Sequence, residues 1–198
     1  LWQFNLDHPE RAKHMLFICH SFQMACGHFG VAEITERKSQ SFGVFPVHKT
    51  EAGIKEWLFQ GLDDPFYVAD FRFYQVIRPR TDGFRKLGAK ILLKEKIRPH
   101  VPLERAIMGV RFSDEIIGLQ FHPEAHAAGM VEHFYKKTVQ EKVVELKGEQ
   151  KFAEMIELLG DPSKLEKTHK TIIPGFLRNA IEKVQIRKGA GLSSPASR

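Results

Sequence analysis

The first two thirds of the chain alternate short apolar runs with polar turns. Residues 15–18 form a continuous apolar run, Met-Leu-Phe-Ile, which predicts a strand buried on both faces. Shorter β-prone runs predict further strands at 31–34, 44–47, 66–71, 74–77 and 88–93. The clearest hairpin pattern joins 106–112 to 115–121 through Ser113 and Asp114.

The segments between these runs favour helices. We expect a polar-faced helix over 2–13 and a short helix over 21–29 that ends at Gly30. Pro123 is tolerated in the first turn of a helix, so it predicts a helix that runs on through Phe134. Strands interleaved with helices predict an α/β fold, with a mostly parallel central sheet and helices on both faces.

The pattern changes after Lys147, where the apolar spacing becomes helical. Two amphipathic stripes are predicted: Phe152, Met155, Ile156 and Leu159, then Ile173, Leu177, Ile181 and Val184. They would either pack on the domain or dock a partner helix. We therefore expect an α/β domain over 1–140, a helical extension over 141–188 and a disordered tail over 189–198, where Gly, Ala and Ser dominate.

Composition narrows the class of protein. The 198 residues are 42% hydrophobic and 27% charged, which is typical of a globular protein with one sizeable core. No apolar run approaches the roughly 20 residues of a membrane span. The net charge of +6 comes from Lys and Arg interleaved with Asp and Glu, so we expect a solvated basic surface and no nucleic-acid partner. Two cysteines and no secretion signal predict a cytoplasmic protein.

Cys19 stands where the first strand gives way to a helix. A strand that ends at a nucleophile and turns sharply into a helix forms the nucleophile elbow of α/β hydrolytic enzymes. The elbow exposes the thiol, and the helix N-terminus favours its thiolate form. The alternative is a buried core cysteine, which is the interpretation we give to Cys26.

The segment Gly-Leu-Gln-Phe-His-Pro-Glu at 118–124 supplies a base and an acid. His122 follows the last strand of the hairpin, at the sheet edge where α/β active sites gather, and Glu124 can fix its tautomer. A capping or surface histidine is the alternative. His126 lies four residues beyond His122, but the order of residues does not match a zinc helix, so no metal is expected. The chain has no glycine-rich phosphate loop, and we expect no nucleotide or other cofactor.

Together these two segments resemble the class I glutamine amidotransferases, the triad family that includes the glutaminase domain of GMP synthase. The family elbow reads roughly Gly-Ile-Cys-x-Gly-x-Gln, and its second motif Gly-x-Gln-Phe-His-Pro-Glu matches residues 118–124 completely. The resemblance implies a flavodoxin-like three-layer sandwich. It also implies that Cys19 is the nucleophile, His122 the base and Glu124 the orienting acid. Gln23 would contact the substrate glutamine, and an ammonia-accepting synthase domain or subunit would be the partner.

Several positions depart from the family pattern. Ser21 replaces the elbow glycine, and Phe17 replaces the glycine before the nucleophile. Residues 71–74, Phe-Arg-Phe-Tyr, stand where the family has Ser-His-Gly-Asp. Arg72 would bind a substrate carboxylate or form a structural ion pair. His20 is expected to line the pocket and to offer its backbone N–H to an oxyanion.

The family domain also places several parallel strands before the nucleophile strand, whereas 14 residues precede Met15 here. We therefore expect the N-terminal strands to be missing from this chain. Two alternatives to glutamine hydrolysis stay open. One is a γ-glutamyl hydrolase that uses the same triad on a larger substrate, and the other is a non-catalytic relative that serves as a binding module.

Overall fold

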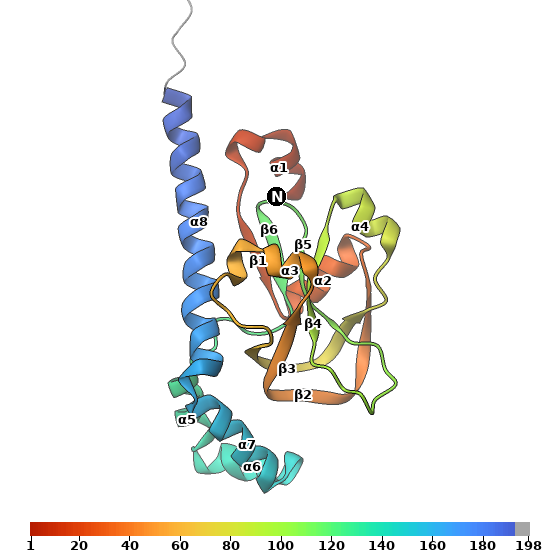
Figure 1. The fold of residues 1–198 in the computed structure, drawn as a ribbon, viewed down its shortest axis with the longest axis vertical. Helices are drawn as coiled ribbons and strands as arrows, with labels where there is room; N and C mark the ends of the chain where they lie inside the picture. Colours follow the sequence, from red (N-terminus) through yellow and green to blue (C-terminus); the bar gives the residue numbers. More distant parts are fainter. Residues whose placement is uncertain (193–198) are drawn as a thin grey trace, which may run out of the picture.

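A computed structural model describes residues 1–192 of the chain. Its six strands are β1 (Met15–Ile18), β2 (Glu33–Lys49), β3 (Phe66–Ile77), β4 (Lys90–Glu95), β5 (Ile107–Arg111) and β6 (Ile116–Leu119). They form one sheet in the order β1-β6-β5-β4-β2-β3. The predicted α/β fold is confirmed: helices flank a mixed sheet (Figure 1).

The strand directions differ from the prediction of a mostly parallel sheet. Only β1 and β6 are parallel, while the other four neighbouring pairs are antiparallel. A short turn links β5 to β6, and a short turn can join only antiparallel neighbours, because a parallel pair needs a long crossover. The chain between β1 and β6 provides such a crossover.

The helices are α1 (Trp2–Asp7), α2 (His20–His28), α3 (Glu51–Lys55), α4 (Thr81–Leu87), α5 (Ala127–Phe134), α6 (Lys137–Lys147), α7 (Glu149–Gly160) and α8 (Lys167–Leu192). Short helical turns cover Pro9–Arg11, Trp57–Phe59 and Pro162–Glu166. No helix within residues 1–192 is both long enough and apolar enough to cross a bilayer.

Apolar residues on opposite faces of the sheet build two separate cores. On one face, Phe22 and Cys26 of α2 pack with Ile107 of β5. On the other face, Met108 of β5 packs with Ile172 of α8. Successive residues of a strand point to opposite faces, so β5 contributes to both cores and the fold has three layers.

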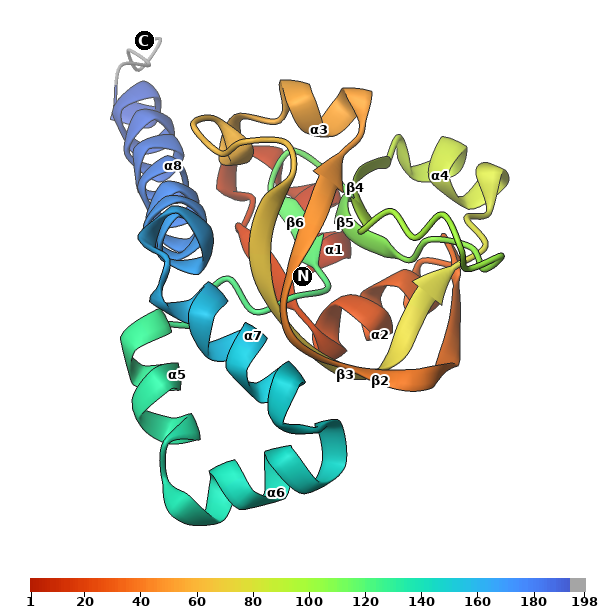
Figure 2. The same cartoon turned by 60° about the horizontal axis from the view of Figure 1, so that its bottom comes forward.

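The C-terminal helices lie beside the sheet and partly against it. Helices α5, α6 and α7 form a group next to β2 and β3, and α8 runs along the side of the molecule (Figures 1 and 2). A third core joins this group to the sheet, with Phe134 and Phe152 packed against Val44 and Ala69. The predicted stripe on α7 is therefore confirmed as a buried face.

Most of the second predicted stripe does not pack on the sheet, which was one of its two expected roles. Leu177 and Ile181 of α8 are 53% and 55% exposed, whereas Ile172 and Phe176 are buried. The helix turns positions 172 and 176 toward the sheet, so each of these buried residues lies one position before a residue of the predicted stripe.

Element boundaries also differ from the predictions. Residues 33–34 and 44–47 of two predicted runs belong to the single strand β2, whose pairing with β3 shifts register between Glu36 and Ser41. The helix expected from Pro123 begins at Ala127. The expected boundary at 140/141 falls inside α6. Residues 189–192 complete α8, in contrast to the predicted tail, and 193–198 lie outside the described residues.

Candidate active site

The backbone of Cys19 forms a sharp elbow between β1 and α2. Its φ of 49° and ψ of −102° lie in a region that side chains with a Cβ rarely adopt. The Cys19 N–H donates to the Leu119 carbonyl at 2.8 Å, which fixes the elbow to the end of β6. The carbonyl of Cys19 accepts from the Gln23 N–H at 3.1 Å and begins the helix. The half-buried side chain is therefore held at the sheet edge in a strained conformation.

Ser21, which departs from the family glycine, closes this elbow with its hydroxyl. The Ser21 Oγ accepts from the Ile18 N–H at 2.8 Å and donates to the Ile18 carbonyl at 2.9 Å. Both backbone groups of Ile18 are satisfied by one side chain. Serine thus adds two side-chain hydrogen bonds to the turn, which a glycine could not make.

Gly118 of β6 allows α2 to pack closely behind the elbow. Gly118 lies opposite Phe17 in the parallel register of β1 and β6. A Cβ placed on Gly118 would lie 2.5 Å from Cδ2 of Phe22, inside contact distance. The glycine at the start of the 118–124 motif is therefore required for helix-to-sheet packing.

His122 lies between Cys19 and Glu124. Its backbone N–H donates to the Ala69 carbonyl of β3 at 2.9 Å. Its Nδ1 lies 2.7 Å from Oε1 of Glu124, so Nε2 is the ring nitrogen left for Cys19. A hydrogen bond with Cys19, followed by the one with Glu124, raises the pKa of the imidazole to about 10, against burial, which lowers it. The three side chains predicted as catalytic therefore form one linked array.

Glu124 is half exposed, with 50% of its side chain accessible. Burial raises the pKa of its carboxyl, but the hydrogen bond and charge of His122 outweigh burial and hold the pKa below its usual value. An ionised Glu124 can accept a hydrogen bond from the Nδ1–H group and thereby favour a protonated ring.

Gln120 is the residue of this site that the sequence did not reveal. It is fully buried, and its Nε2 lies 3.9 Å from the Cys19 sulfur. Its Oε1 accepts from Nε2 of Gln23 at 3.2 Å, and Gln23 donates as well to the Tyr74 carbonyl at 3.3 Å. The signal that the sequence offered was a polar residue, Gln120, in the short segment between the last strand and His122.

The three predicted substrate contacts have different surroundings. His20 is exposed at the start of α2, next to Cys19. Gln23 is 6% exposed and bonded as described above. Arg72 is 3% exposed; its guanidinium bonds Asp70 at 2.9 Å and Glu95 at 3.2 Å. These contacts are those of a structural ion pair, which was the alternative expected for Arg72. A contact between Arg72 and substrate stays a prediction.

Solved structures of other proteins share this fold. A glutamine amidotransferase from Thermotoga maritima matches with a TM-score of 0.59 at 19% identity, covering 92% of this chain and 68% of that one. The protein SMU.1228c matches with a TM-score of 0.58 at 14% identity, covering 90% of this chain and 70% of that one. No family sequence model and no curated protein matches the chain. At these identities the likeness shows the fold: the chain has a class I glutamine amidotransferase-like, flavodoxin-type α/β fold with C-terminal helices.

Proposed function

We propose that this protein hydrolyses the side-chain amide of glutamine through Cys19, His122 and Glu124. The observation that carries the proposal is the linked array of the three side chains at the strained turn after β1. Cys19 has φ of 49°, His122 lies 2.7 Å from Glu124 through its Nδ1, and Cys19 is the first cause that raises the pKa of His122 to about 10. A nucleophile, a base and a group that orients the base are the components of a catalytic triad.

In the first half of the reaction, the Cys19 thiolate attacks the amide carbon of glutamine. The negative charge that develops on the amide oxygen is stabilised by the backbone N–H of His20, in the first turn of α2. The protonated His122 gives its proton to the leaving nitrogen, so that ammonia departs and a thioester to Cys19 remains.

In the second half, the neutral His122 takes a proton from water as that water attacks the thioester. Glutamate leaves and its new carboxyl releases a proton to solvent, while the sulfur departs as the thiolate and the ring keeps the proton taken from water. The starting pair of thiolate and protonated His122 is thereby restored, and Glu124 holds the imidazole throughout. Gln120 orients the sulfur through its amide N–H and is a positioning residue. The ammonia would pass to an acceptor on a synthase domain or on a partner subunit.

Replacement of the nucleophile tests this proposal directly. In the full-length protein, Cys19→Ala should reduce ammonia release from glutamine by at least about a thousandfold, because no thioester can form. The matched control is Cys26→Ala: burial raises the pKa of the Cys26 thiol, so this cysteine stays protonated and should not be needed. Unchanged ammonia release by the Cys19→Ala protein would refute the proposal.

A thiol-reactive glutamine analogue provides the second readout. Mass spectrometry should find the label on the peptide that contains Cys19 and none on Cys26. A protein that folds normally but is not labelled would instead be the non-catalytic binding module. Faster turnover of γ-glutamyl amines than of glutamine would favour the γ-glutamyl hydrolase.

A further inference from the structure

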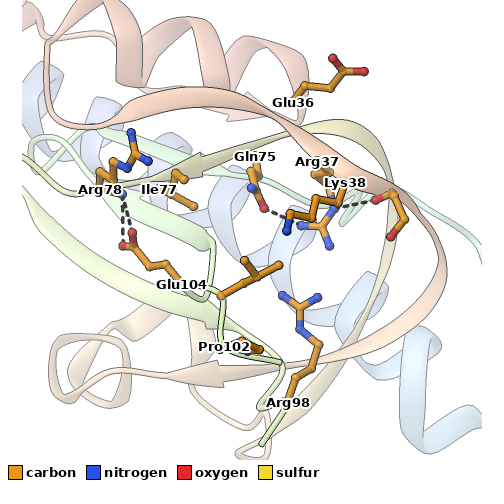
Figure 3. Close-up of a pocket in the computed structure, with 11 residues that line it drawn as sticks. Glu36, Arg37, Lys38, Gln75, Ile77, Arg78, Arg98, Pro102 and Glu104 are labelled. Atoms are coloured by element: carbon orange, nitrogen blue, oxygen red, sulfur yellow. Dashed lines mark hydrogen bonds between the residues drawn. The ribbon is translucent and has the colours of Figure 1, made fainter. Parts of the chain in front are cut away.

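A basic cavity lies apart from the Cys19 and His122 site. It has a volume of about 280 Å³ and lies between the shifted segment of β2, the end of β3 and the loop that follows β4 (Figure 3). Its basic lining residues are Arg37, Lys38, Arg78 and Arg98. None of the proposed catalytic side chains lines this cavity.

Two of these cations are held in place by a buried carboxylate. Arg37 Nη2 lies 2.9 Å from Glu95 Oε1, and Arg98 Nη2 lies 2.8 Å from Glu95 Oε2. The side chains of Arg37 and Glu95 are only 8% and 5% exposed. Arg37 also donates to the Gln75 side chain at 3.0 Å. The guanidinium groups are therefore fixed before any ligand arrives, which lowers the entropy lost on binding.

The charges around Glu95 do not balance. Glu95 pairs with Arg37, Arg98 and also Arg72, which it shares with Asp70. Three arginines face two carboxylates, which leaves one positive charge. Burial, followed by the charge of Arg72, lowers the pKa of Arg37 despite its bond to Glu95. The carboxylate thus compensates the neighbouring cations only in part.

The lining also contains two carboxylates, those of Glu36 and Glu104. Glu104 accepts a hydrogen bond from the Arg78 backbone N–H at 3.1 Å, so its carboxylate lies at the end of the cavity next to Arg78. Figure 3 shows the Glu36 side chain pointing away, whereas the ends of Lys38 and Arg98 point into the cavity. Lys38 adds a second positive charge to the one left around Glu95.

We propose that this cavity binds the phosphate group of a small phosphorylated molecule. The ends of Lys38 and Arg98, which point into the cavity, place two cations where a phosphate monoester, which carries nearly two negative charges near neutral pH, would lie. Arginine guanidinium groups bind phosphate oxygens with paired N–H donors, and lysine adds a point charge. The volume is below the roughly 300 Å³ at which common small-molecule pockets begin, so the bound group is small.

Calorimetric titration with inorganic phosphate, at constant ionic strength set with sodium chloride, tests the assignment. The wild-type protein should show one saturable site. Lys38→Gln and Arg98→Gln should each weaken phosphate binding about tenfold, the effect of losing one charge-assisted hydrogen bond. The matched controls, Lys86→Gln and Arg85→Gln on the exposed surface of α4, should bind phosphate as the wild type does.

Two results would overturn the assignment: no saturable binding to the wild-type protein, or equal binding to wild type and Lys38→Gln. Lys38 is exposed, so its replacement should leave folding intact even where Arg98→Gln does not. Malonate, a dianion with carboxylate chemistry, should bind more weakly than phosphate; tighter malonate binding would contradict a phosphate site. The titration needs no turnover, and so its failure leaves the proposed glutamine hydrolysis untouched.

Discussion

The ionisation of His122 depends on its neighbour Cys19. The hydrogen bond with Cys19 is the largest cause that raises the pKa of His122 to about 10. In the Cys19→Ala protein we therefore expect the pKa of His122 to fall well below 10, as followed by NMR titration of the ring. Cys26→Ala should leave the titration of His122 unchanged, and an equal fall in both variants would exclude the pairing.

This coupling also sets a pH window for stability. A histidine whose pKa is raised on folding stabilises the native state below its ordinary value of 6.5, and that contribution is lost as the pH rises through about 10. The difference in free energy of unfolding between the wild type and His122→Asn should therefore shrink between pH 7 and pH 10.

Ser21 gives a second prediction at the residue scale. Ser21→Ala removes the hydroxyl that bonds both backbone groups of Ile18, and should lower the free energy of unfolding by about 1–2 kcal/mol. Urea denaturation measures the loss. Ser39→Ala, at an exposed position, is the control and should change stability by less than about 0.5 kcal/mol. A loss no greater than that of the control would show that water satisfies Ile18 equally well.

The sequence predicted some residues of the site better than others. Cys19, His122 and Glu124 were predictable because each follows a strand end, and strand ends meet at one edge of a sheet. The bond from Gln23 to Gln120 and the ion pair of Arg72 with Glu95 join residues far apart in the chain. These contacts depend on strand order and register, which no local pattern contains.

At the scale of the element, α8 is the helix whose packing can be tested most directly. Ile172 is fully buried in the core shared with β5 and β6, whereas Ile181 on the same helix is 55% exposed. Ile172→Ala should destabilise the protein by about 2–5 kcal/mol, because it leaves a cavity. The same change at Ile181 should cost less than about 0.5 kcal/mol, measured by urea denaturation. Equal losses would mean that α8 packs through a different face.

Local patterns predicted the existence of elements more accurately than their extent. The apolar run at 15–18 and the hairpin of β5 and β6 were predicted because buried strands are recognisable from consecutive apolar residues. The polar residues 35–40 interrupt the pattern of β2, yet pairing with β3 continues it as one strand with a register shift. Backbone hydrogen bonds from a distant strand override local propensity here.

At the scale of the whole molecule, Glu95 ties several separate segments together. It binds arginines from β2, from β3 and from the loop after β4. Glu95→Gln would leave Arg37 and Arg98 without their carboxylate and Arg72 with Asp70 alone, and should lower the free energy of unfolding by about 3–5 kcal/mol. Glu154→Gln on the surface of α7 is the control and should have little effect.

The effect of Glu95 should depend on pH. Burial raises the pKa of its carboxyl, but the three arginines outweigh burial and hold the pKa below the ordinary value of 4.5. Its contribution is therefore present above pH 4.5 and lost as the pH falls through its lowered pKa. The stability difference between wild type and Glu95→Gln should narrow as the pH falls below 4.5, and a constant difference would contradict the ion pairing.

The hydroxyl of Ser21 has a consequence for association between molecules. Strand β1 is an edge of the described sheet. Residues 15, 17 and 19 direct their backbone groups toward β6, so the backbone N–H and carbonyl groups of Leu16 and Ile18 point away from the sheet. An open edge of this kind invites pairing with a foreign strand. Since Ser21 already occupies both groups of Ile18, a strand added along β1 must stop short of Cys19. Strand addition along this edge would therefore not reach the nucleophile.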